Sequence, residues 1–232
     1  MITQASLVAA FGIGAAWAVR GRSSSVFGPS RWRGEAGRKA LALTFDDGPS
    51  PSTPLFLDIL AEHHVQATFF QVGANVERNP KIARAVVAAG HEIGNHSYSH
   101  TNFALKSAAL IGSDFARAQT AISETSGVLP TLVRAPFGVR WFGFREMQAQ
   151  LGLKGVMWTV IGLDWKLPAS GIADRVLKNA SDGGIICLHD GRGTEQNPDV
   201  SPAAEAVRRL VPALMATGYH FVTVSELLWP TK

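Results

Sequence analysis

The chain has 232 residues, of which 46% are hydrophobic and 17% are charged, so it can bury a sizeable core and is not expected to be disordered. The formal charge of +4 comes without a dense block of lysine or arginine, and nothing in the sequence indicates binding to nucleic acid. The single cysteine, Cys187, excludes a disulfide within the chain and stands in an apolar run, where a buried thiol is expected.

An apolar segment without charges covers residues 5–19 and is followed by several arginines. It is shorter than the ~20 residues that usually span a bilayer, and it lacks the basic start of a signal peptide. An export signal, a membrane anchor and a helix packed on the domain all remain open. We assign residues 1–37 to this segment and a linker rich in Arg, Ser and Gly, and residues 38–232 to one folded domain.

Short apolar runs alternate with stretches of helical periodicity along the rest of the chain. The runs predict strands at residues 41–45, 67–72, 91–94, 131–135, 154–160, 184–188 and 219–223. The stretches between them predict helices at residues 53–64, 79–89, 104–126, 143–151, 170–180 and 200–217. Such alternation is typical of an α/β protein with a parallel sheet, and about seven strands favour a closed or nearly closed (β/α) barrel.

Residues that can do chemistry stand at the ends of five predicted strands. They are Asp46 and Asp47, His96 and His100, Arg134, Asp164, and His189. Each has an ordinary structural explanation when taken alone, such as an aspartate that caps a turn, a histidine in a surface loop or a solvated arginine. In a barrel, however, the carboxyl ends of the strands share one face, so these side chains are expected to converge.

Two histidines and one carboxylate are typical of a hydrolytic zinc site with a fourth position left for water. His96 and His100 would supply the imidazoles, and one of the two aspartates the carboxylate; the spacing does not say which one. The other aspartate could act as a general base, held ionised by the cation and by Arg134, and His189 could protonate the leaving group. The residues therefore predict metal-assisted hydrolysis of an amide or an ester.

Five short stretches resemble, in the right order, the five motifs of polysaccharide deacetylases with the NodB-homology domain, carbohydrate esterase family four. They are TFDDGPS (44–50), HSYSH (96–100), RAPFG (134–138), DW (164–165) and LHD (188–190). The resemblance covers roughly residues 38–228 and implies a distorted (β/α) barrel with its helices outside. It also implies one divalent metal, usually zinc and sometimes cobalt, with a metal-bound water that removes N-acetyl groups from GlcNAc polymers or O-acetyl groups from xylan.

The resemblance also implies roles for individual residues. Asp46 would be the base, oriented by Arg134, and His189 would be the general acid, tuned by Asp164. The implied metal ligands are Asp47, His96 and His100. The implied substrate-binding residues are Pro136, Phe137, Trp165 and Leu188, and a backbone N–H near Phe137 would assist the oxyanion.

Two departures from the family pattern are small. Phe137 stands where tyrosine is frequent, and Ile161 stands where a polar residue is common. No acid–base residue is missing, so residues 38–232 are expected to form an active polysaccharide deacetylase domain. Hydrolysis of acetylxylan or of small amides on the same barrel remains an alternative, while the intact Asp46 and His189 count against a non-catalytic glycan-binding domain.

The expected partner is an acetylated polysaccharide such as peptidoglycan or chitin oligomers, and the expected state is a monomer. The resemblance favours the cell envelope or the outside of the cell over the cytoplasm. Association with a membrane through residues 5–19 remains open.

Overall fold

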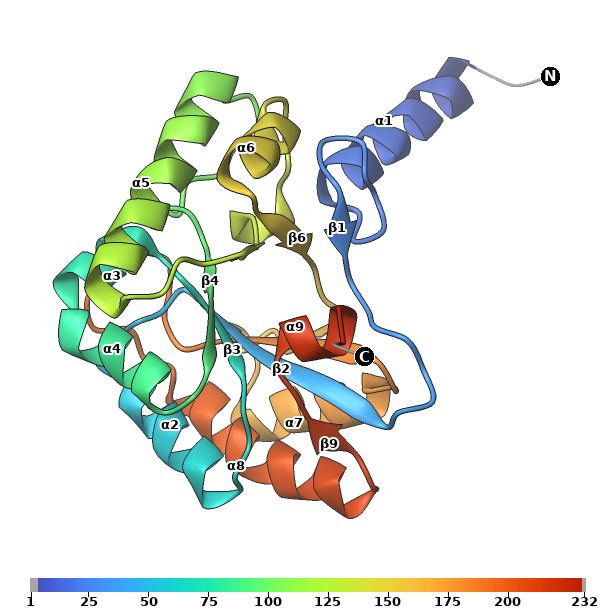
Figure 1. The fold of residues 1–232 in the computed structure, drawn as a ribbon. Coiled ribbons are helices and arrows are strands. Elements are labelled where there is room, and N and C mark those ends of the chain that lie inside the picture. Colours follow the sequence, from blue (N-terminus) through green and yellow to red (C-terminus); the bar gives the residue numbers. More distant parts are fainter. Residues whose placement is uncertain (1–3, 231–232) are drawn as a thin grey trace.

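Helices surround a curled sheet in the computed structural model, which describes residues 4–230 and the side chains of residues 12–230 (Figure 1). The strands are β1 (Ser30–Arg31), β2 (Ala40–Asp46), β3 (Thr68–Gln71), β4 (Glu92–Asn95), β5 (Leu132–Val133), β6 (Lys154–Val156), β7 (Val160–Ile161), β8 (Gly184–His189) and β9 (His220–Phe221). The helices are α1 (Gln4–Arg20), α2 (Thr53–Glu62), α3 (Gly73–Arg78), α4 (Pro80–Ala88), α5 (Ala108–Ser126), the short 3-10 helix η1 (Pro136–Gly138), α6 (Phe144–Leu151), α7 (Ala169–Asn179), α8 (Ser201–Ala216) and α9 (Val224–Leu228). Each predicted strand and helix overlaps an observed one, whereas β1, α3, η1 and α9 were not predicted.

The sheet has the order β1-β6-β5-β4-β3-β2-β8-β7 with parallel neighbours, and β9 pairs with the start of β2. The single strand predicted at 154–160 is in fact two, because β6 pairs with β5 while β7 pairs with β8 at the other edge of the sheet. Between them, Met157 N donates to Arg31 O (2.7 Å) and Thr159 N donates to Ile185 O (2.9 Å). This crossing joins the two ends of the curled sheet and confirms the distorted (β/α) barrel. The split strand and β1 raise the number of strands in the described residues from about seven to nine.

Strand β2 is buried along its whole length, because helices cover one face and the barrel interior lies on the other. The odd-numbered residues from Leu41 to Phe45 pack in the larger core, which includes side chains of α2 and α8. Ala40 and Ala42 belong to a smaller cluster inside the barrel, which includes side chains of α9. Because side chains alternate along a strand, this inward-facing row continues to Asp46 and brings its carboxylate into the barrel interior.

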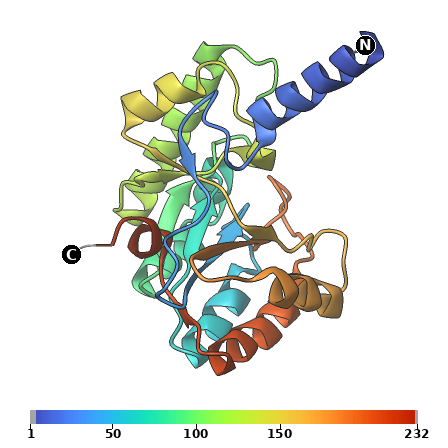
Figure 2. The same cartoon turned by 90° about the vertical axis from the view of Figure 1, so that its right-hand side faces the viewer.

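Helix α1 projects away from the barrel and contacts η1 (Figures 1 and 2). Residues 12–17 of α1 are exposed, among them Ile13 and Trp17, so this part of the predicted apolar segment is not packed on the domain. The side chains of residues 5–11 lie outside the described residues. Within the described part of the chain, no helix combines the length and apolarity needed to cross a bilayer.

The stretch after α1, predicted as a linker, is attached to the barrel by the buried Arg140. The backbone N of Arg140 donates to Val19 O (3.0 Å), and its Nη1 donates to Ser24 O (2.7 Å). Burial lowers the pKa of Arg140 to about 10, so the guanidinium is still charged at neutral pH. Further along, β1 pairs with β6. The stretch is therefore part of the barrel wall.

Replacing Arg140 should loosen this attachment. In Arg140→Ala the buried carbonyl of Ser24 and the half-buried carbonyl of Gly21 lose their guanidinium donor, and we expect the free energy of unfolding to fall by about 3 kcal/mol. Urea unfolding measures the loss, and limited proteolysis should cleave near residues 20–26 sooner than in the wild type. The control is Arg209→Ala, which removes an exposed pair with Glu205 and should change stability by less than about 1 kcal/mol. Equal stability of the two variants would contradict the role given to Arg140.

Candidate metal centre and active site

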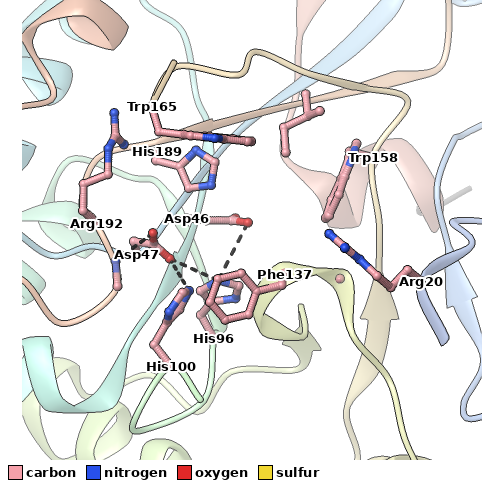
Figure 3. Close-up of a pocket in the computed structure, with 13 residues that line it drawn as sticks. Arg20, Asp46, Asp47, His96, His100, Phe137, Trp158, Trp165, His189 and Arg192 are labelled. Atoms are coloured by element: carbon pink, nitrogen blue, oxygen red, sulfur yellow. Dashed lines mark hydrogen bonds and ion pairs between the residues drawn. The ribbon is translucent and has the colours of Figure 1, made fainter. Parts of the chain in front are cut away.

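The carboxyl ends of β2, β4 and β8 meet around one cavity of about 450 Å³ (Figure 3). The predicted site residues that line it are Asp46, Asp47, His96, His100, Phe137, Trp165 and His189. Arg134 and Asp164 are buried directly behind the cavity wall, where each contacts a lining residue. Pro136 and Leu188 are also buried and are not among the lining residues. The barrel thus brings together side chains from five separate motifs, as expected for strand ends on one face.

Asp47, His96 and His100 form a compact cluster at this face. Asp47 follows β2 in a left-handed conformation (φ 74°), and its Oδ1 lies 2.8 Å from His100 Nε2 and 3.3 Å from His96 Nε2. The other oxygen, Oδ2, accepts a hydrogen bond from Gly193 N at 2.9 Å. The side chain is thus held by one oxygen, while the other points at the two imidazoles.

The orientation of the side chains in this cluster suits a cation. His96 Nδ1 donates to Arg134 O at 2.7 Å, so Nε2 is the ring nitrogen that faces Asp47 and is free to bind a cation. Burial alone would raise the pKa of the Asp47 carboxyl, but the His100 and His96 imidazoles beside it hold the pKa well below its usual value. Asp47 Oδ1 is buried and receives no well-aligned hydrogen bond. Two nitrogens and one such oxygen fit one divalent metal with a coordination position left open.

Asp46 is separated from the metal cluster by its pairing with a buried arginine. Its Oδ1 lies 2.6 Å from Arg134 Nη1, while its Oδ2 lies 3.9 Å from His96 Nε2. Arg134 is fully buried, and its Nη1 also donates to Thr44 Oγ1 at 2.8 Å. The geometry therefore gives the two neighbouring aspartates different surroundings, with Asp47 among the imidazoles and Asp46 on the guanidinium.

A second group of potential ligands consists of Asp46, Cys187 and His189. Burial raises the pKa of the Cys187 thiol well above its usual value, so the sulfur stays protonated and donates to Asp46 Oδ2 at 3.5 Å. A protonated thiol is a poor metal ligand. Cys187 is therefore the inert buried thiol that the sequence predicted, and this group is the weaker metal site.

His189 is paired with Asp164 on the opposite side of the cavity from the metal cluster. Its Nδ1 donates to Asp164 Oδ1 at 2.8 Å, and its backbone N donates to Asp164 Oδ2 at 2.9 Å. Burial disfavours the imidazolium, but the charge and the hydrogen bond of Asp164 outweigh it and raise the pKa of His189 to about 9. His189 is therefore protonated at neutral pH and can donate a proton into the cavity.

Aromatic rings form the rim of the cavity. Phe137 is 50% exposed, adopts a left-handed conformation (φ 57°) and meets the ring of His100 at 4.8 Å between centroids. Trp165, 51% exposed, stands edge-on to His189 at 5.3 Å. These two rings leave an open apolar entrance above buried polar groups.

Several functional positions were missed from the sequence. Asn75 on α3 donates to Asp47 O (2.8 Å) and to Gly193 O (2.7 Å), which joins the loops after β2 and β8. Arg192 and Gly193 directly follow the motif that holds His189, and this position could have suggested a role for them. Arg20 also lines the cavity, although it is the last residue of α1 and precedes all five motifs (Figure 3). Nothing in the local sequence indicates that placement.

Removing one imidazole should abolish tight metal binding. Changes to groups that only support metal ligands already cost about 10–100-fold in affinity, so we expect His100→Ala to weaken zinc binding by at least about 100-fold. Competition with a chromophoric chelator measures the affinity, and zinc should raise the melting temperature of the wild type but not of His100→Ala. The matched control is His220→Ala, at an exposed histidine outside the cluster. Equal zinc affinity of the two variants would contradict the ligand assignment.

Comparisons with known proteins identify the family of this chain. A family described as polysaccharide deacetylase matches residues 33–156. The chain is 36% identical to the peptidoglycan-N-acetylglucosamine deacetylase PgdA of Listeria monocytogenes over 82% of its own length, but spans only 39% of that relative. It is also 36% identical to a chitooligosaccharide deacetylase of a Bradyrhizobium strain, covering 83% of this chain and 92% of the relative.

Among solved structures, the Bc1960 peptidoglycan N-acetylglucosamine deacetylase superposes with a TM-score of 0.80 and 30% identity. The match covers 87% of this chain and 93% of that one. The order of the motifs, the barrel and the relatives confirm the resemblance found in the sequence. The chain belongs to the polysaccharide deacetylase family.

Proposed function

We propose that this protein is a metal-dependent deacetylase that hydrolyses the N-acetyl groups of a GlcNAc-containing polysaccharide, with zinc as the metal. One observation carries the proposal: a cluster that fits a divalent cation lies between an aspartate held by a buried arginine and a histidine held by a buried aspartate. The names of the relatives support the same substrate class, since they refer to peptidoglycan and to chitooligosaccharides. We also propose a role at the cell envelope, where peptidoglycan lies.

The residues of the cavity divide the chemistry among them. Asp47, His96 and His100 would hold the metal, which, when bound, polarises the acetyl carbonyl and makes water easier to deprotonate. Asp46 removes the proton from the attacking water with its Oδ2, because Arg134 occupies Oδ1. Arg134 also fixes the direction of the Asp46 carboxylate.

On the other side of the scissile amide, His189 donates its proton to the departing nitrogen. Asp164 holds the ring by Nδ1, so the Nε2–H is the one that faces the substrate. The carbon–nitrogen bond breaks with this transfer, and the products are acetate and a free amine. Phe137 contributes its ring to the entrance, and its backbone N–H, presented in a strained left-handed conformation, donates to the developing oxyanion.

The proposed base can be separated from metal binding by one substitution. Asp46→Asn keeps the shape of the side chain but cannot take a proton, so we expect deacetylation to fall by about 10²–10⁴-fold. Acetate release from GlcNAc oligomers and from peptidoglycan, with zinc added, measures the loss. The zinc content should equal that of the wild type, because Asp46 is not a proposed ligand. The control is Asp174→Asn at an exposed aspartate of α7, which should retain full activity. Unchanged turnover in Asp46→Asn would refute the assignment of the base.

The pairing of His189 with Asp164 predicts a change in pH dependence. His189 acts in its protonated form, so activity falls as the pH rises through its pKa. Because Asp164 is what raises that pKa, Asp164→Asn should lower it, and the alkaline limb of kcat/KM should move to lower pH by about 1–3 pH units. Asp164→Glu, which restores the charge, should move the limb back toward the wild type. An alkaline limb that stays in place in Asp164→Asn, with activity merely reduced, would show that Asp164 only supports the structure.

A further inference from the structure

A second cavity, of about 430 Å³, adjoins the active-site cavity and shares Trp158 and Ile161 with it. Three arginines line it: Arg22 from the stretch after α1, Arg33 from the stretch after β1, and Arg175 from α7. The other residues that line it carry no charge. A concentration of positive charge thus lies beside the proposed site of deacetylation, outside the five family motifs.

Hydrogen bonds to the barrel hold each of the three arginines in place. Arg22 Nη1 donates to Thr159 O at 2.5 Å, and Arg175 Nε donates to Ile161 O at 2.7 Å. Arg33 Nη2 donates to the Ser181 hydroxyl at 2.9 Å. These acceptors are neutral and use only part of each guanidinium, so further N–H groups remain for a ligand.

No carboxylate of the described residues neutralises these charges. Within the part of the chain that the structure describes, none of Arg22, Arg33 and Arg175 forms an ion pair. Asp182 is the neighbour of Ser181, but its carboxylate accepts hydrogen bonds from the backbone N of Gly37 and of Ala40. The three guanidinium groups therefore give the cavity a positive charge that would attract an anion.

Aromatic rings give the second cavity a flat wall. The ring of Trp32 lies against both Arg22 and Arg33, whose guanidinium carbons are 5.0 and 5.5 Å from its centroid. Such stacking orients a guanidinium and leaves its edge free for hydrogen bonds. Trp158 stands between the two cavities and lies across the active site from Arg192 (Figure 3). A polymer bound in the active site can extend over Trp158 and present its next units to the arginines.

From this arrangement we propose that the second cavity binds a carboxylate carried by a sugar unit near the one that is deacetylated. The preferred substrate is then an acidic N-acetylated glycan, in which neighbouring sugar units carry carboxylates. This inference rests on the proposed function and narrows its substrate class. Arg22 and Arg175 are binding residues in this account and take no part in the bond-breaking step.

The test compares three oligosaccharides of equal length. The first contains N-acetylglucosamine only; in the second, alternate sugars carry a free carboxylate, as N-acetylmuramic acid does; in the third, those carboxylates are converted to methylamides. The variants are Arg22→Gln and Arg175→Gln, and the control is Lys178→Gln, which removes an exposed charge from the same helix as Arg175, outside the cavity.

The wild type should prefer the acidic oligosaccharide to its methylamide, chiefly through a lower KM. In each arginine variant the ratio of kcat/KM for the acidic oligosaccharide to that for its methylamide should fall by about tenfold. A hydrogen bond to a charged group contributes enough free energy to change affinity by about tenfold or more. Lys178→Gln should keep the preference, and added salt should reduce it in the wild type. A wild type without the preference, or arginine variants that retain it, would overturn the inference. Equal losses on all three oligosaccharides would do the same, because they would indicate general damage to the site.

Calorimetry separates failure of this inference from failure of the proposed function. If the wild type deacetylates none of the three oligosaccharides, the proposed function is wrong, but their binding can still be measured. Tighter binding of the acidic oligosaccharide than of its methylamide, lost in Arg22→Gln, would still support the carboxylate site. Equal binding of the two would refute it.

Discussion

The buried pair of Arg134 and Asp46 is the constraint around which the rest of the site is arranged. A guanidinium with no exposed surface is costly unless its partner stays ionised and its geometry is fixed. Here it lies 2.6 Å from the carboxylate and 4.1 Å from the centre of the Phe70 ring. The carbonyl of the same arginine accepts the Nδ1–H of His96, so one residue orients both the Asp46 carboxylate and the ring of a metal-ligand candidate.

The closure of the barrel is coupled to this pair. The crossing between β6 and β7 places Met157 O 3.4 Å from Arg134 Nη2, so the stretch that completes the ring also contacts the buried charge. The next residue, Trp158, lies between the two cavities. Met157, Trp158 and Thr159 are consecutive in the chain. Met157 and Thr159 close the barrel through their backbone N–H groups, Met157 also contacts Arg134, and Trp158 separates the two cavities.

The sequence predicted the ends of β2 and β8 well because these apolar runs stop at polar residues with a proposed chemical role, Asp46 and His189. It did not distinguish Asp46 from Asp47, since that difference arises from a left-handed turn at Asp47 that redirects its side chain. The division of 154–160 into β6 and β7 was not predictable either. Every residue of 154–160 is compatible with a strand. The strand is interrupted only because β6 pairs with β5 while β7 pairs with β8, and these partners are distant in sequence.

The residues before the first motif have a practical importance that their sequence does not reveal. The match to the family begins at residue 33, yet Arg20, which lines the active-site cavity, and Arg22 and Trp32, which line the second cavity, precede it. A recombinant protein that began at residue 33, where the match begins, would keep every motif and the full set of proposed ligands. It would nevertheless lose one wall of each cavity, and its substrate profile would describe a more open enzyme than the natural one.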